Sequence, residues 1–185
     1  CIRSSNNIYN QSLLASLIAH NGENAAENWA KKVVNNFSRE PKGNDRSQMT
    51  AVVLNECDIT LANTYYLGKW IASDKDLERQ YSDKIAVFFP NQKSRGAHIN
   101  ISGAAVIKTS KNTSGAIKFI EFLASDKAQK LYSQTNHEYP IRDDIQISKI
   151  DKSWGYPFKK DRLSLNKLGI FNKKAVMIFD KVGWN

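Results

Sequence analysis

The sequence has no long unbroken hydrophobic run, and glycine, proline and cysteine are scarce. Its longest apolar stretches, such as 13–19, fall short of the roughly 18 residues that a membrane helix requires. The 185 residues include 9 Gly, 4 Pro and 2 Cys, which excludes a collagen-like repeat and a disulfide-rich miniprotein. With 41% hydrophobic residues, the chain is able to bury a core, as one sizeable domain or two small lobes.

The first residues of the sequence resemble an internal segment of a longer chain rather than an N-terminus. Cys-Ile-Arg-Ser-Ser has neither the basic nor the apolar region of a signal peptide, so we expect further chain before Cys1. Cys1 and Cys57 match no zinc or Cys-x-x-Cys spacing. Both lie at predicted strands, so they form either a disulfide, if those strands are neighbours, or two buried thiols.

Positive charge is in excess, with 27 Lys and Arg against 18 Asp and Glu and a net charge of +9. The basic doublets Lys31-Lys32, Lys159-Lys160 and Lys173-Lys174 are isolated on separate amphipathic segments. Scattered lysines of this kind are typical of solvated helix faces. We therefore expect no nucleic-acid partner.

Apolar residues that recur every three or four positions predict several helices. Asn44 or Asp45 is expected to cap the third helix and Ser125 a later one, and the stretch 139–158 is rich in loops. The predicted helices cover 9–20, 24–37, a segment through 49–53, 74–82, 116–123 and a segment through 128–132, with further helical patterns at 163–168 and 174–180.

Short apolar runs between these helices predict strands at 1–4, 58–63 and 85–89. The stretch 97–108 is expected to be extended, with a bend at Gly103. Strands alternating with helices require crossover connections. The expected fold class is therefore α/β, with a parallel-rich sheet flanked by helices.

Three tyrosines follow two of the predicted strands. Tyr65 and Tyr66 come just after 58–63, and Tyr9 follows the loop after the first strand. In open α/β sheets, ligands bind outside the carboxyl ends of the strands. We therefore expect the three phenols to face one crevice.

Three phenols suit a hard, highly charged metal ion. A phenol has a pKa near 10 and ionises at neutral pH only beside strong positive charge, which a trivalent ion supplies. Phenolate is a hard anionic donor that favours ferric iron. Two other interpretations remain open from the residues alone, namely aromatics that stack on a sugar or amino-acid solute and tyrosines that only pack in the fold.

Other polar residues give weaker signals. The polar run that includes Ser4 and Ser5 fits an ordinary helix cap better than an anion site. His20, His98 and His137 share no metal-binding spacing, so we expect structural or solvent-facing roles. The sequence has no Gly-x-Ser-x-Gly motif, P-loop, His-Glu-x-x-His motif or dinucleotide-binding turn. A hydrolase or transferase is therefore a rival hypothesis without a motif, and we do not expect an enzyme.

Many blocks of the sequence resemble ferric-iron-binding periplasmic proteins of ABC transporters, in order and in approximate spacing. The most specific is Asn-x-Tyr-Tyr at 63–66, which matches the metal motif of that family. The resemblance implies a class II, two-lobed fold of the transferrin-like group that closes on Fe3+. The matching blocks are 1–12, 40–46, 57–68, 87–92, 98–104, 122–132, 137–140 and 182–184.

The resemblance also implies roles for individual residues. Tyr65 and Tyr66 match the paired tyrosine ligands, and Tyr9 matches a third tyrosine of the cyanobacterial-type branch. Asn63 matches a position that supports a synergistic anion such as carbonate or citrate. Ser4 and Ser5 lie near the segment that binds such an anion.

The remaining expectations concern the whole protein. The resemblance implies a monomeric periplasmic protein that delivers ferric iron to an inner-membrane ABC permease, with a sugar- or polyamine-binding module as the alternative. Relatives begin about one lobe earlier, so we expect this chain to lack the N-terminal lobe segment. It would then comprise a C-terminal-lobe core at 1–96, a segment of the N-terminal lobe at 97–142, and returning C-terminal helices at 143–185.

Overall fold

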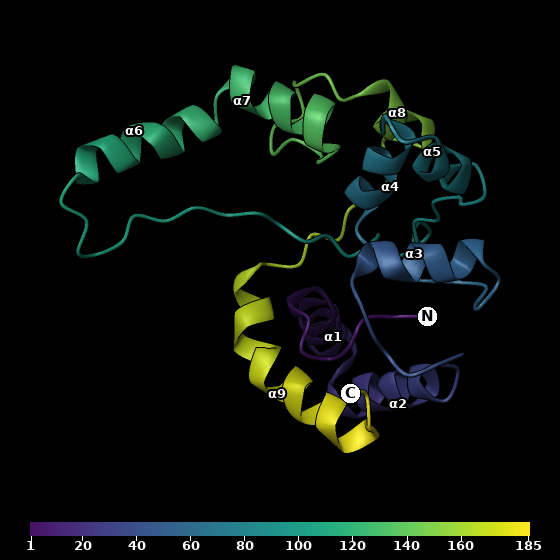
Figure 1. The fold of residues 1–185 in the computed structure, drawn as a ribbon. Helices are drawn as coiled ribbons and strands as arrows, with labels where there is room; N and C mark the ends of the chain where they lie inside the picture. Colours follow the sequence, from purple (N-terminus) through teal and green to yellow (C-terminus); the bar gives the residue numbers. More distant parts are fainter. The chain divides into compact units, whose positions relative to one another are not determined.

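The computed structural model describes residues 1–185, and helices make up nearly all of the regular structure (Figure 1). No helix is both long enough and apolar enough to cross a membrane. The helices are α1 (Ile8–Asn21), α2 (Glu23–Val34), α3 (Asp45–Val53), α4 (Thr64–Ile71), α5 (Asp76–Ser82), α6 (Thr113–Leu123), α7 (Asp126–Leu131), the π-helix η1 (Tyr132–Asn136), α8 (Lys149–Ser153) and α9 (Asn166–Val182).

The chain forms two compact units, each made of segments distant in sequence. The first unit comprises 1–63, 89–100 and 158–185. The second comprises 64–88 and 101–157. The division into lobes at 1–96, 97–142 and 143–185 stays a prediction.

The core of the first unit lies where α1, α2 and α9 pack together. Leu14 and Phe179 are almost completely buried there. Gly183 adopts a left-handed conformation, with φ 73°, that ends α9 and that residues other than glycine disfavour. Trp184 is buried in the same core, with its ring centroid 4.8 Å from that of Phe179 and 5.3 Å from that of Phe37.

A covalent link and an ion pair connect the N-terminal segment of the first unit to later parts of the chain. Cys1 and Cys57 form a disulfide with their Cα atoms 5.7 Å apart, which is one of the two alternatives that the sequence left open. The backbone nitrogen of Cys1 donates to the carbonyl of Ile59 at 2.9 Å. Arg3 Nη1 lies 2.5 Å from Oδ2 of the buried Asp45, the first residue of α3.

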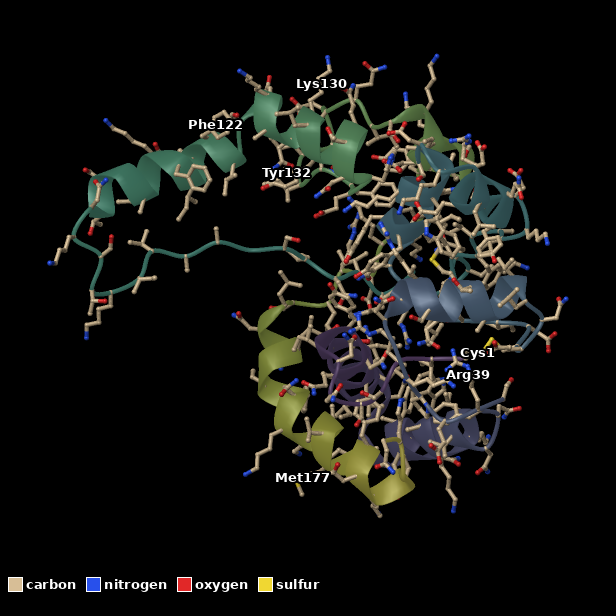
Figure 2. All side chains as sticks on the ribbon, viewed as in Figure 1. Cys1, Arg39, Phe122, Lys130, Tyr132 and Met177 are labelled. Carbon is tan, nitrogen blue, oxygen red and sulfur yellow. A yellow bond between two sulfur atoms is a disulfide. The ribbon has the colours of Figure 1, made fainter.

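The predicted helices are present, with altered ends. Asn44 caps α3 in a reciprocal capping box with Ser47, and Ser125 caps α7, as their sequence positions predicted. The pattern at 174–180 and residues 166–168 of the pattern at 163–168 belong to one 17-residue helix, α9, whereas 163–165 precede it and are not helical. Met177 of α9 is 60% exposed and points outward (Figure 2).

The predicted strands at 1–4, 58–63 and 85–89 do not form a β-ladder, and neither does the stretch 97–108, which was expected to be extended. The chain contains one isolated parallel bridge, between Ala97 and Lys160. Ala97 donates to the carbonyl of Lys159 and accepts from the amide of Asp161, both at 2.8 Å. A strand exists only when its backbone groups pair with a neighbouring strand, so apolar runs without such partners do not become strands.

In the second unit, α4 is the best-packed element and α6 the least. α4 packs against α5, α8 and η1, and Trp70 is buried with its ring centroid 5.9 Å from that of Tyr81 in α5. By contrast, α6 has no buried residue. Phe119 and Phe122 on this helix are exposed.

Candidate functional site

Tyr65 and Tyr66 lie together in the first turn of α4. Their ring centroids are 4.3 Å apart and the ring planes are tilted by 34°. Both residues are partly buried. Lys69, one turn further along α4, places its Nζ 5.2 Å from the centroid of the Tyr65 ring. The structure thus brings two phenols and a cation together at the start of one helix.

Tyr9 lies in the first turn of α1, in the first unit. Asn7 caps this helix, and its Oδ1 accepts a hydrogen bond from the Tyr9 amide at 3.0 Å. The guanidinium carbon of Arg3 lies 5.8 Å from the centroid of the Tyr9 ring. Tyr9 and the pair Tyr65–Tyr66 therefore have similar local settings, each at a helix start beside a cation, but they belong to different units.

Ser4 and Ser5 form part of the loop before α1. The Ser4 hydroxyl donates to Oδ1 of Asn6, and the Ser4 carbonyl accepts from the amide of Asn7 at 3.2 Å. The Ser5 carbonyl accepts from Nε2 of Gln11 at 3.1 Å. Asn7 is the capping residue that the polar run provides, and a role for Ser4 and Ser5 at an anion stays a prediction.

Asn63 belongs to a polar network that the sequence did not reveal. Its Oδ1 accepts from Nδ2 of Asn100 at 2.9 Å. The Ser12 hydroxyl, on α1, lies 2.5 Å from Oδ1 of Asn100, 3.1 Å from Nε2 of His98 and 3.0 Å from the carbonyl of Tyr9. The only sequence signal was that His98 and Asn100 alternate in an extended segment and so share a face.

The histidines contact protein groups. His20 Nε2 lies 2.8 Å from Oδ2 of Asp161, and the buried His137 places Nδ1 3.3 Å from Oδ1 of the buried Asp151. Burial lowers the pKa of His98 and raises that of Asp151, because removal from water disfavours the charged form. No three His, Cys, Asp or Glu residues are grouped so that they could hold a metal ion.

The fold is similar to that of solved ferric-binding proteins. A Trichodesmium protein, IdiA or FutA, solved in complex with iron and citrate, has 47% sequence identity and a TM-score of 0.94, over 100% of this chain and 58% of that one. A ferric binding protein from Campylobacter jejuni has 41% identity and a TM-score of 0.95, again over 100% of this chain and 58% of that one. These likenesses confirm the predicted class II periplasmic-binding-protein fold.

Residues 9–130 match the model of the bacterial extracellular solute-binding protein family, and the chain belongs to that family. Among curated relatives, iron uptake protein A1 of Synechocystis is 48% identical over 99% of this chain and 51% of its own length. The major ferric iron-binding protein of Neisseria meningitidis is 30% identical over 71% of this chain and 38% of its own length. The chain spans about half the length of the Synechocystis relative.

Proposed function

We propose that this chain binds ferric iron through the phenolates of Tyr9, Tyr65 and Tyr66. The observation that carries the proposal is the close pair of partly buried tyrosine rings, 4.3 Å apart, at the start of α4. Two neighbouring phenols offer two hard anionic donors to one ion. Tyr9 is the third donor, and three phenolates balance the charge of Fe3+. The relatives named for ferric iron support this choice of ligand.

Further polar groups support the bound ion in this proposal. Arg3 and Lys69 lie close to the rings of Tyr9 and Tyr65, where positive charge offsets the charge of a phenolate. A synergistic anion such as carbonate or citrate completes the site, and Asn63, Ser4 and Ser5 lie near it. The Trichodesmium relative, solved with iron and citrate, supports the presence of an anion.

The proposed biological role is transport rather than catalysis. The protein captures ferric iron or a ferric chelate in the periplasm as a monomer and delivers it to an ABC permease in the inner membrane. Membership of the extracellular solute-binding family supports this location. The relative named as an iron uptake protein supports the role in transport.

The colour of the ferric complex tests the proposal. Addition of ferric citrate to the purified protein is expected to produce a visible phenolate-to-iron charge-transfer band. Tyr65→Phe and Tyr66→Phe each remove one donor and are expected to weaken this band and the binding of iron. Tyr132→Phe is the matched control, because Tyr132 lies in η1 and is not a proposed ligand.

Two results together would overturn the iron assignment. One is a colourless parent protein in the presence of ferric citrate. The other is calorimetric binding of a sugar or polyamine that persists in the Tyr65→Phe and Tyr66→Phe variants, which would favour an organic-ligand module.

A further inference from the structure

Gly68 lets α4 approach another part of the second unit closely. A Cβ atom at this position would lie 2.5 Å from both Cβ and Cγ of His137, which is shorter than any ordinary carbon–carbon contact. The backbone of α4 therefore rests directly against the His137 side chain, and only glycine permits this approach. Gly68 follows Tyr66 by two positions, so the contact lies within one turn of both tyrosines.

The backbone of His137 is in an uncommon conformation. It ends η1 with φ 59° and ψ 31°, in the left-handed region, which a non-glycine residue adopts only when its surroundings favour it. The residue is 3% exposed.

Buried polar groups lie beside the His137 ring. Its Nδ1 lies 3.3 Å from Oδ1 of Asp151 and 3.4 Å from the hydroxyl of Ser148. Ser148 caps α8 by accepting from the Asp151 amide at 3.0 Å, and its own amide donates to the hydroxyl of Ser133 at 3.0 Å. The ring thus lies beside the start of α8, whose capping residue Ser148 is hydrogen-bonded to Ser133 of η1. Both α8 and η1 pack against α4.

Stability alone does not account for such a pair. Removal of a carboxylate and an imidazole from water costs free energy that their mutual attraction often fails to recover, whereas fixed geometry is an attested use of buried polar pairs. A helix of eight residues such as α4 is marginal by itself, so its position depends on what it packs against.

We propose that the buried pair His137–Asp151, through the contact of His137 with Gly68, positions α4 and thereby sets the arrangement of the Tyr65 and Tyr66 phenols for the metal. This inference rests on the proposed function. His137 and Asp151 are positioning residues that touch no ligand. They act on the metal only through the helix that carries the tyrosines.

The first test substitutes the glycine. In Gly68→Ala the new methyl group forces α4 away from His137, so the ring-proton shifts of Tyr65 and Tyr66 in the iron-free protein should change. In the ferric protein the charge-transfer band should shift. Iron should bind roughly 10- to 100-fold more weakly, which is the usual effect of changing a residue that orients a metal ligand. Gly103→Ala, also in the second unit, is the control, because nothing lies within 4 Å of its Cβ.

A second variant covers the case in which Gly68→Ala does not fold. His137→Asn keeps a residue that tolerates the left-handed conformation and an amide that can face Asp151, but it removes the ring that contacts Gly68. It should fold and show the same changes in tyrosine ring shifts, band and iron affinity. A purely structural role predicts a lower unfolding temperature with the parent's ring shifts and band.

The outcomes separate this inference from the proposed function. If the parent protein gives no ferric band, the proposed function fails, and the ring shifts of the iron-free variants still decide whether α4 is positioned by His137. If the parent binds iron but the folded variants keep its ring shifts and band, the positioning role is overturned and the iron site stands.

Discussion

Tyr9 and Tyr65 each lie beside a cationic side chain, and these contacts come from neighbours along the chain. Arg3 precedes Tyr9 by six residues, and Lys69 follows Tyr65 by four, at 5.8 Å and 5.2 Å from the respective ring centroids. Residues four apart lie on the same face of a helix, so the second contact follows directly from the sequence. Each of these two proposed ligands therefore has one positive charge nearby that would partly offset the negative charge of its phenolate.

We expect His98 to make the stability of the chain depend on pH. Burial lowers its pKa below the usual value of about 6.5, so the unfolded chain takes up a proton near pH 6.5 while the folded chain does not. The free energy of unfolding should therefore fall as the pH is lowered through about 6.5 towards the folded-state pKa, and then level off.

Urea unfolding of the parent and of His98→Gln at a series of pH values measures this contribution. The unfolding free energy of the parent should fall relative to that of His98→Gln as the pH falls from about 7 to about 5. His20 and His137 are present in both proteins and cancel in the comparison. Parallel pH profiles would show that burial of His98 does not affect its titration.

At the scale of elements, α1, α2 and α9 form the principal core of the chain. Phe179→Ala, on the buried face of α9, should lower the free energy of unfolding by about 3–5 kcal/mol, because it leaves a cavity beside Trp184. Met177→Ala, on the exposed face of the same helix, should change it by less than about 0.5 kcal/mol. Denaturant titration provides both values, and equal losses would contradict this assignment of faces.

The elements that the sequence predicted correctly are those that depend on residues close together in the chain. Periodic apolar residues gave α1, and the caps Asn44 and Ser125 gave the starts of α3 and α7. The strands were predicted wrongly because a strand depends on a partner distant in sequence, and only Ala97 and Lys160 pair. Propensity and pattern do not contain that information.

The site divides in the same way. Adjacent tyrosines after an apolar run were readable from the sequence, and so was the family motif at 63–66. The link from Asn63 through Asn100 to Ser12 joins positions far apart in the chain. The contact of Gly68 with His137 is equally non-local, and no short motif marks either of them.

At the scale of the whole molecule, the proposed ligands come from both compact units. Tyr9 belongs to the unit that contains 1–63, whereas Tyr65 and Tyr66 belong to the unit that contains 64–88. A metal bound by all three would therefore couple the two units energetically, because ligand binding stabilises the arrangement that it requires.

The most direct measurement is a crystal structure of the protein loaded with ferric citrate. We expect one ferric ion that is bound at the same time by the phenolate oxygens of Tyr9, Tyr65 and Tyr66. An ion bound elsewhere, or a structure in which the Tyr9 hydroxyl lies away from the ion held by Tyr65 and Tyr66, would contradict this expectation.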